Sequence, residues 1–320
     1  MKKIICLIII LYAVEAFNQE LKTDCAAADP SLGLVNYTQL QLYSLNYSTL
    51  HSSNKSKHTR AYYINSRTFE FLDFFAASNP QYFGFNIYFI SYRKKKTARS
   101  QAESSQSLLY VVPVYDSPAA GKDTTADYIA LEQFFRTSGG AFSKDSLNHG
   151  IACDGECDSS INAWTYTSSA KRLDGQPGGS TESDIFLLTT GKEIHATNRE
   201  NFKEDHLDIE LGGKQTTWVY FKAEKIKLIA DFVKGKKDYP MVGIYFGSYN
   251  AKRIPKQAHK DQTTLTLVPM RQMSHGYYEP DVCAFVTFIN EKLKNGTLKF
   301  RTGINHSELC PDDCPTGGNK

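Results

Sequence analysis

The chain has 320 residues, of which 41% are hydrophobic and 22% charged, and its formal net charge at pH 7 is +3. This composition is typical of a globular protein with a buried core, and the length predicts two domains of ordinary size. The small charge excess argues against a nucleic-acid-binding protein, which normally carries a clear basic surplus.

The first 16 residues have the pattern of a signal peptide. Lys2 and Lys3 precede an apolar stretch at 4–14, and Val14-Glu15-Ala16 fits a cleavage site. The apolar stretch is shorter than the roughly 20 residues that cross a membrane, and no later segment is apolar enough, so we expect no transmembrane span in the mature chain. The expected location is therefore outside the cytoplasm: periplasmic, secreted or at the cell surface. An N-terminal anchor that is never cleaved is the alternative.

The rest of the chain carries one pattern twice. Residues 82–92 read YFGFNIYFISY and residues 239–249 read YPMVGIYFGSY, an offset of 157 residues. The run Asn-His-x3-Cys-x3-Cys at 148–157 returns at 305–314 with the same offset. Self-similarity at a fixed spacing indicates a tandem duplication of one domain. The predicted organisation is a signal peptide at 1–16, a first repeat at 17–157, a Ser/Gly/Pro-rich linker at 158–183, a second repeat at 184–314 and a disordered tail at 315–320.

Both repeats predict the same order of elements. A capping-box pattern opens each copy, Thr38-x-x-Gln41 in the first and Thr190-x-x-Glu193 in the second. In the first repeat, the expected elements are a helix at 38–49, a short strand at 60–64, a helix at 66–77, strands at 85–92 and 108–114, and a helix at 126–136. In the second repeat, they are a short strand at 217–221, a helix at 223–234, strands at 242–249 and 265–270, and a helix at 281–293. Each repeat ends in an irregular Asn-His-Cys segment. This order predicts an α+β fold of two similar domains, each a small, mainly antiparallel sheet with helices packed on one face.

Six of the seven cysteines remain after the signal peptide is removed, and export permits them to form disulfides. Cys25 and Cys283 have no counterpart in the other repeat, so they are each other's natural partners. Their bridge would join the N-terminus to the second domain. The other four occur as one pair per repeat, and we expect each pair to close a small loop in its own domain: Cys153 with Cys157, and Cys310 with Cys314.

The same segments permit a second interpretation, a metal site. Each segment places a histidine four residues before the first cysteine, and one imidazole with two thiolates supplies three of the four ligands of a zinc site. Structural zinc sites usually have Cys-x2-Cys spacing, which favours the disulfides, and free or redox-active thiols are the third possibility. The two candidate sets are His149, Cys153 and Cys157 in the first repeat, and His306, Cys310 and Cys314 in the second.

A row of tyrosines in the repeated strand is a candidate ligand surface. Tyrosine rings offer flat apolar area with a polar tip. Because the spacing of four places them on one face of a strand, they form either a ligand platform or the packed face of the sheet. The residues are Tyr88 and Tyr92 in the first repeat and Tyr245 and Tyr249 in the second.

The second repeat contains the motif GIYFGSY, then TLTLVPM, then NHSELCPDDCP. This pattern resembles an uncharacterised family of small exported or cytosolic Bacteroidota proteins with a G-I-x-x-Y-F-G-x-Y strand and a terminal N-x-x-x-x-C-P-x-x-C segment. The first repeat departs from the pattern, because Asn86 and Ile90 replace the two glycines and Asp154 replaces the proline. The resemblance implies a fold module and a bacterial envelope or secreted setting, and it implies no assigned activity. The matching residues are Gly243, Tyr245, Phe246, Gly247, Tyr249, Val268, Pro269, Asn305, Cys310, Pro311 and Cys314.

Motifs of known enzymes are absent from the sequence, which has no G-x-S-x-G, H-E-x-x-H, Walker or dinucleotide-binding pattern. We therefore predict no cofactor and a non-catalytic binding role, with a polysaccharide, an envelope component or another protein as partner. The first alternative is an enzyme with an unfamiliar site near the aromatic strand and the Asn-His-Cys segment, where His149 or His306 acts as base. The second alternative is a metal-handling or thiol-redox protein that uses the Cys-x3-Cys loops.

Overall fold

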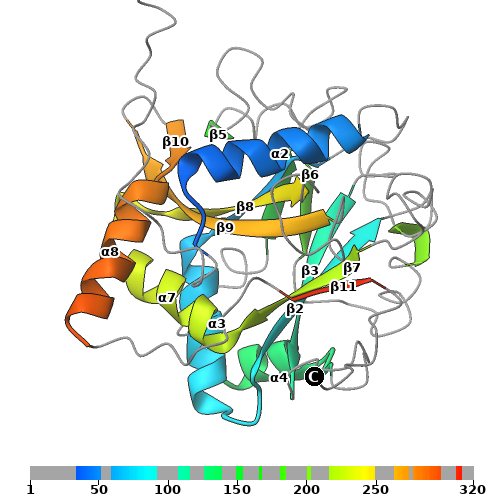
Figure 1. The fold of residues 1–320 in the computed structure, drawn as a ribbon. Coiled ribbons are helices and arrows are strands. Elements are labelled where there is room, and N and C mark those ends of the chain that lie inside the picture. Colours follow the sequence, from blue (N-terminus) through cyan, green and yellow to red (C-terminus); the bar gives the residue numbers. More distant parts are fainter. Residues whose placement is uncertain are drawn as a thin grey trace, which may run out of the picture.

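Two antiparallel sheets and the helices around them form the described part of the chain, which confirms the predicted α+β class (Figure 1). The computed structural model describes residues 34–51, 59–91, 107–115, 126–138, 149–153, 166–167, 181–184, 200–202, 216–248, 263–273, 277–296 and 308–311. The seven-stranded sheet has the order β5 (Tyr166–Thr167), β10 (Tyr277–Pro280), β9 (Thr263–Gln272), β8 (Met241–Ser248), β1 (Ala61–Asn65), β4 (His149–Cys153) and β6 (Thr181–Asp184). The four-stranded sheet has the order β11 (Glu308–Pro311), β7 (Thr216–Lys222), β2 (Gly84–Ser91) and β3 (Ser107–Val114).

The described helices lie close to their predicted positions. They are α2 (Tyr37–His51), α3 (Ser66–Ser78), α4 (Ala130–Thr137), α7 (Ala223–Val233) and α8 (Val282–Lys294). The capping box of α2 is formed two residues earlier than predicted. Asn36 accepts a hydrogen bond from the amide of Gln39 at 2.7 Å, and the Gln39 side chain accepts one from the amide of Asn36 at 2.9 Å. Asparagine therefore takes the place assigned to Thr38, because it is equally suited to an N-cap.

Each sheet contains strands from both repeats. In the seven-stranded sheet, β1 of the first repeat lies between β4 of the same repeat and β8 of the second. In the four-stranded sheet, β7 of the second repeat lies between β11 of the same repeat and β2 of the first. Each repeat therefore contributes its first strand to the hairpin of the other, and the prediction of a separate sheet for each repeat is wrong.

The two exchanged strands pair in the same register. Tyr63 faces Gly243 across β1 and β8, and Tyr220 faces Asn86 across β7 and β2. Both members of the second pair are displaced from those of the first by the repeat offset of 157 residues. The hairpins β2–β3 and β8–β9 are antiparallel, as predicted from their spacing.

Helices α3 and α7 carry the chain from one sheet to the other. Helix α3 follows β1 and leads into β2, whereas α7 follows β7 and leads into β8. The amide of Ser66 donates to the carbonyl of Pro240 at 2.9 Å, and the amide of Ala223 donates to the carbonyl of Phe83 at 2.9 Å. Each helix start is thus held by the hairpin of the other repeat.

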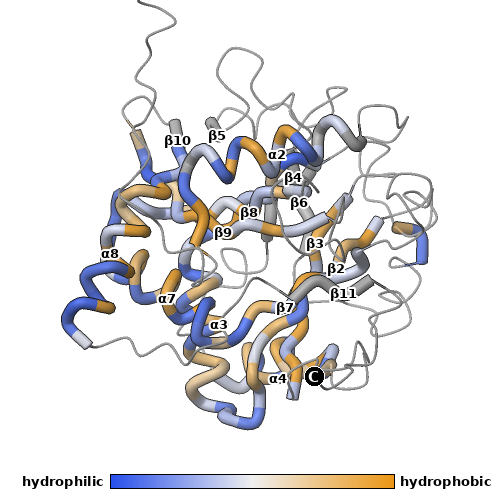
Figure 2. The backbone as a smooth tube through the Cα atoms, in the orientation of Figure 1, coloured by the Kyte–Doolittle hydropathy of each residue, from blue (hydrophilic) through white to orange (hydrophobic). Residues whose placement is uncertain are grey.

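One large apolar core joins the two sheets. It includes Tyr62 and Ile64 from β1, Ile244 from β8, and Ile87 and Phe89 from β2. A smaller cluster on the other face of β1 and β8 contains Tyr63, Tyr245, Leu40 of α2 and Val282 of α8. Hydrophobic residues follow β2, β3 and β7, and hydrophilic residues gather at the C-terminal end of α8 (Figure 2).

Three details of the predicted elements are wrong. The segments 149–153 and 308–311, predicted to be irregular, are the strands β4 and β11, because each pairs with the first strand of its own repeat. The predicted linker at 158–183 contributes β5 and the first residues of β6 to the seven-stranded sheet. Helix α4 begins at Ala130 rather than at residue 126, because the Asp127 side chain accepts the amides of Ile129 and Ala130 and holds the residues before Ala130 in a turn.

Candidate functional site

A cluster of two tyrosines and one aspartate lies where β2 begins and β3 ends. The Tyr82 hydroxyl donates to Oδ2 of Asp127 at 2.8 Å, and the Tyr115 hydroxyl donates to the same oxygen at 2.6 Å. The two phenol oxygens are 3.0 Å apart, and the rings are stacked with centroids separated by 4.5 Å. These contacts fix the orientation of the Tyr115 ring, which is 44% exposed.

Asp127 also binds the backbone at the start of helix α4, whose N-cap residue is Ile129. Its Oδ1 accepts hydrogen bonds from the amides of Ile129 at 3.2 Å and Ala130 at 3.1 Å. Partial burial by itself raises the pKa of the Asp127 carboxyl, but hydrogen bonds from Tyr115, Tyr82 and the two amides outweigh it and hold the pKa below its usual range. The carboxylate is thus ionised and already has four donors, so it positions Tyr115 rather than offering an acceptor to a ligand.

The second repeat contains the capping part of this arrangement. The Tyr239 hydroxyl donates to Oδ2 of Asp281 at 2.8 Å, and Oδ1 of Asp281 accepts the amide of Ala284 at 3.0 Å at the start of α8. Burial and the Asp281 carboxylate both raise the pKa of the Tyr239 hydroxyl above its usual range. The ring of Tyr239 packs on Phe232 at 4.8 Å, as Tyr82 packs on Phe75 at 4.9 Å.

Matching backbone contacts support this equivalence. The amide of Asp127 donates to the carbonyl of Pro113, and the amide of Asp281 donates to the carbonyl of Pro269, both at 3.0 Å. A tyrosine–aspartate cap at the start of the last helix is therefore found in both repeats, which indicates a structural role for the cap itself.

Four residues of the first repeat that belong to the cluster or are linked to it by contacts have exposed apolar side chains, and we call them the exposed apolar set: Phe74, Phe83, Tyr115 and Ile129. Their exposed fractions are 45%, 57%, 44% and 49%. They are four of the six large apolar side chains that are exposed in the described part of the chain. Burying such groups against a partner is favourable, and an exposed concentration of them often marks an interaction site.

Contacts connect each member of the set to the cluster. The Phe74 ring packs on Phe134 at 5.4 Å, and Phe134 packs on Phe75, which in turn packs on Tyr82. The amide of Phe83 donates to the carbonyl of Val114, the residue before Tyr115, at 2.9 Å. Ile129 is joined to Asp127 through its amide.

The second repeat has a different residue at every one of these positions. The strand and helix equivalences above align Phe74 with Asp231, Phe83 with Pro240, Tyr115 with Arg271 and Ile129 with Cys283. The paired strands and the tyrosine–aspartate bond are thus formed in the second repeat without the exposed apolar side chains. The fold does not require them, so they are candidates for function.

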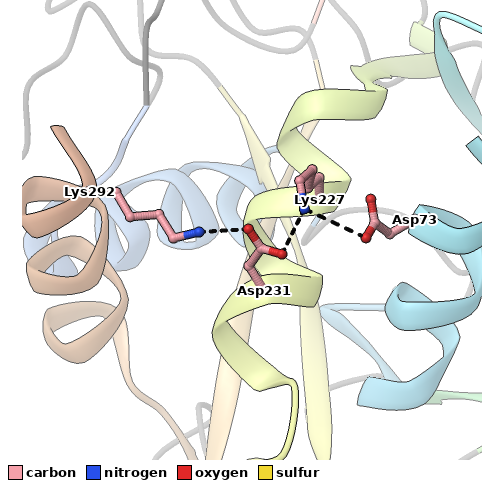
Figure 3. A network of polar contacts seen from close by, with 4 residues as sticks. All are labelled: Asp73, Lys227, Asp231 and Lys292. Carbon is pink, nitrogen blue, oxygen red and sulfur yellow. Dashed lines mark hydrogen bonds and ion pairs between the residues drawn. The ribbon is translucent and has the colours of Figure 1, made fainter. Parts of the chain in front are cut away.

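Asp231, which replaces Phe74, belongs to a charged network instead (Figure 3). Lys227 and Lys292 donate to its two oxygens at 2.8 Å and 2.6 Å, and Lys227 also lies 3.9 Å from Asp73. Burial by itself raises the pKa of Asp231, but the two lysines outweigh it and lower the pKa. The network joins α3, α7 and α8 and is partly exposed, so we assign it a modest structural role.

The tyrosines predicted as a ligand surface have other positions. Tyr88 and Tyr245 are 0% and 1% exposed, so the ligand-surface prediction does not hold for these two rings. Tyr88 stacks on Tyr128 at 6.0 Å, and Tyr245 meets Tyr63 edge-on at 6.3 Å, because both rings fill the packed faces of central strands. Tyr92 and Tyr249 lie outside the described residues.

The predicted cysteine and histidine sites are described only in part. The backbones of His149 and Cys153 lie in β4 and that of Cys310 in β11, with Cys153 facing Ala61 and Cys310 facing Trp218. Cys283 is disulfide-bonded. No group of three metal-ligating side chains occurs among the described residues. The remaining candidates, Cys25, Cys157, His306 and Cys314, lie outside the described residues.

The sequence contains a pattern that indicates the cluster, but the 157-residue offset of the repeats does not align its aspartates. Tyr82 and Tyr239 open the repeated segments, but Asp127 and Asp281 are separated by 154 residues rather than 157. Loops of unequal length between the aligned strands and the last helix cause this difference. An alignment anchored on the aspartates that precede the two helices would have paired these residues.

No family model, curated protein or solved structure matches this chain. The resemblance to the Bacteroidota family therefore stays a prediction. Among the helices of the described residues, none combines the length and the apolar character needed to span a membrane.

Proposed function

We propose that this chain is an exported, non-catalytic binding protein made of two copies of one α+β module, and that it binds its partner at the exposed apolar set of the first repeat. The N-terminal segment supports an exported setting, and the resemblance to Bacteroidota proteins supports a bacterial envelope. The matched registers and matched tyrosine–aspartate caps support two similar modules.

One observation carries the binding role. Tyr115 is 44% exposed, yet its hydroxyl is held on Asp127 at 2.6 Å and its ring is stacked on Tyr82. An exposed aromatic side chain that is already ordered loses little conformational entropy when a partner packs on it. The equivalent residue in the second repeat is Arg271, so the aromatic ring is not a requirement of the fold.

The shape and chemistry of the set favour a polysaccharide. Phe74, Phe83 and Tyr115 supply flat rings, on which the apolar faces of sugar rings can pack, and the tyrosine hydroxyl supplies a polar tip. Because Asp127 has its donors within the protein, a strongly cationic partner has no free carboxylate to bind at this cluster.

The test is binding of the mature chain to an array of bacterial polysaccharides, followed by titration calorimetry with the oligosaccharide that binds best. Two variants take the residue of the second repeat, Tyr115→Arg and Phe74→Asp, so each introduces a side chain that the equivalent position accepts. Each is expected to weaken binding about tenfold or more, the loss typical of a central aromatic contact.

Two matched controls remove exposed apolar side chains elsewhere. Leu45→Ala and Met273→Ala change residues that are 64% and 39% exposed, and neither belongs to the set. They are expected to bind like the wild type. Equal losses in all four variants, or no polysaccharide binding by the wild type, would contradict the proposal.

A further inference from the structure

The two repeats are bound together by reciprocal strands, a relationship that is independent of the proposed ligand. All eight residues of β2 are buried, and so are six of the seven residues of β7, which covers one edge of β2. Without the second repeat, β2 would therefore lose a neighbouring strand and expose unpaired amides and carbonyls. The same holds for β8 without β1 of the first repeat. Exposed edges of this kind bind further strands or aggregate.

The helical residues that precede the exchanged strands also contact the hairpin of the other repeat. Asn46 on α2 of the first repeat donates to the carbonyl of Ser248 on β8 at 3.3 Å. Asn201 of the second repeat donates to the carbonyl of Ser91 on β2, also at 3.3 Å.

The residues that follow these asparagines pack in the same crossed manner. The Tyr47 ring lies 5.5 Å from Phe246, and the Phe202 ring lies 5.3 Å from Phe89. Each repeat thus places a helical segment, and not only a strand, on the hairpin of the other repeat.

The apolar core is shared as well. Phe89 of β2 meets Phe246 of β8 with ring centroids 5.5 Å apart, so the two hairpins pack against each other through buried aromatic rings. Helices α3 and α7 add a contact between the repeats through Lys227 and Asp73. Separating the repeats would expose this core to water, which is unfavourable in proportion to the apolar area.

We propose that each half of the chain is an obligate binding partner of the other: neither repeat folds alone, and the halves stay associated without a covalent connection. The partner that fits the open edge of β2 is a strand like β7 followed by a helix like α7, and the partner that fits β8 is a strand like β1 followed by a helix like α3. The chain is in this sense an internal dimer with reciprocal strand exchange.

The experiment cuts the folded chain between the halves. A protease site is placed in the segment Gly175-Gln176-Pro177-Gly178, between β5 and β6, and the purified full chain is cleaved there. Because Cys283 is disulfide-bonded, the cleaved protein is compared before and after reduction, and the uncleaved chain is reduced in parallel as the control.

The expected result is that the cleaved, reduced protein elutes with the mass of the whole chain and keeps its circular dichroism spectrum. Isotope-labelled and unlabelled cleaved samples are expected to exchange fragments only after denaturant is added. Two fragments that elute separately, each with a folded spectrum, would overturn the proposal.

A second measurement uses the intact, oxidised chain and so does not depend on folding after cleavage. Hydrogen exchange is followed by mass spectrometry at increasing urea, in peptides that contain β1 and β7. Reciprocal pairing predicts that both strands lose protection at one urea concentration, because neither sheet survives without both repeats. Two separate midpoints, one for each repeat, would overturn the proposal.

Discussion

The hydroxyl of Tyr239 donates to the carboxylate of Asp281 at 2.8 Å, and this bond joins the start of a central strand to the start of the last helix. Tyr82 and Asp127 form the same bond at the same distance in the first repeat. In the first repeat, Asp127 accepts a second hydroxyl, that of Tyr115, whose ring is ordered and exposed. A structural cap of the fold thus also positions the residue to which we assign binding.

Removing the tyrosine hydroxyls should have unequal effects on stability. Tyr239→Phe leaves Asp281 without its tyrosine donor and is expected to lower the free energy of unfolding by about 2 kcal/mol, the value typical of hydrogen bonds to charged groups. Tyr82→Phe should cost less than half of this, because Asp127 keeps Tyr115 as a donor. Urea unfolding of both variants measures the difference, and a larger loss for Tyr82→Phe would show that the two caps are not equivalent.

The stability supplied by Asp127 should depend on pH. Its pKa in the folded protein lies below the value of about 3.9 expected in the unfolded chain, so the stabilisation is complete above that value and is lost as the pH falls through the folded pKa. Asp127→Asn keeps a capping oxygen but does not titrate. The difference in unfolding free energy between wild type and this variant should therefore shrink as the pH falls below about 4.

Removing the donors gives the control for this pH effect. In a Tyr82→Phe/Tyr115→Phe background, two of the hydrogen bonds that lower the pKa of Asp127 are absent. The pH dependence of the Asp127→Asn difference should then be weaker. An unchanged dependence would show that the tyrosines do not control the carboxylate.

Gly84 tests the contact between β2 and the exchanged strand β7. A Cβ at this position would lie 2.4 Å from the carbonyl oxygen of Phe221 and 2.5 Å from the ring of Tyr220, both on β7. Gly84→Ala is expected to lower the unfolding free energy by about 3 kcal/mol, as in other overpacked sites. The control is Gly235→Ala, where only the positive φ of 74° opposes the side chain, at a cost of about 1 kcal/mol. Equal losses in thermal unfolding would count against the β2–β7 contact.

Local signals in the sequence were sufficient for most of the elements. The apolar runs that became β2 and β8 predicted central strands, and Asn79-Pro80 marked the end of α3 correctly. The antiparallel hairpins followed from short connections. These features depend on residues close together in the chain, which is why periodicity and turn residues detect them.

The exchange of strands could not be predicted in this way. Because the repeats are similar, β1 meets nearly the same hairpin whether it pairs with β2 of its own repeat or with β8 of the other. Alternation of side chains fixes the register but not the choice between two similar partners. The choice depends on the path of α3 and α7 between the sheets, which is a property of the whole fold.

The tyrosine row shows a related limit. Tyr88 with Tyr92, and Tyr245 with Tyr249, have the spacing of one face of a strand, but spacing does not reveal whether a second layer covers that face. The structure covers both faces of β2, so Tyr88 is buried. The exposed tyrosine of the cluster is Tyr115, which follows the last residue of β3 and is not part of a periodic pattern.

The disulfide of Cys283 is expected to join the N-terminal segment to α8. Leu34 and Val35 pack against the small cluster that contains Val282, the residue before Cys283. Cys25 lies nine residues before Leu34, a length that spans up to about 30 Å when extended. Peptide mapping without reduction should show Cys25 linked to Cys283, and Cys283→Ser should lower stability by about 2–4 kcal/mol. A link from Cys283 to any other cysteine would contradict this pairing.

The reciprocal exchange of strands is tested most directly by cysteine trapping. Asn65 faces Met241 across β1 and β8, and both residues lie at the ends of their strands and are partly exposed. If each repeat instead kept its own first strand, the residue facing Met241 would be Lys222, the counterpart of Asn65 at the repeat offset. The two double variants Asn65→Cys/Met241→Cys and Lys222→Cys/Met241→Cys are oxidised mildly and mapped by mass spectrometry. The exchange predicts a 65–241 disulfide in the first variant and no 222–241 disulfide in the second, and the opposite result would contradict it.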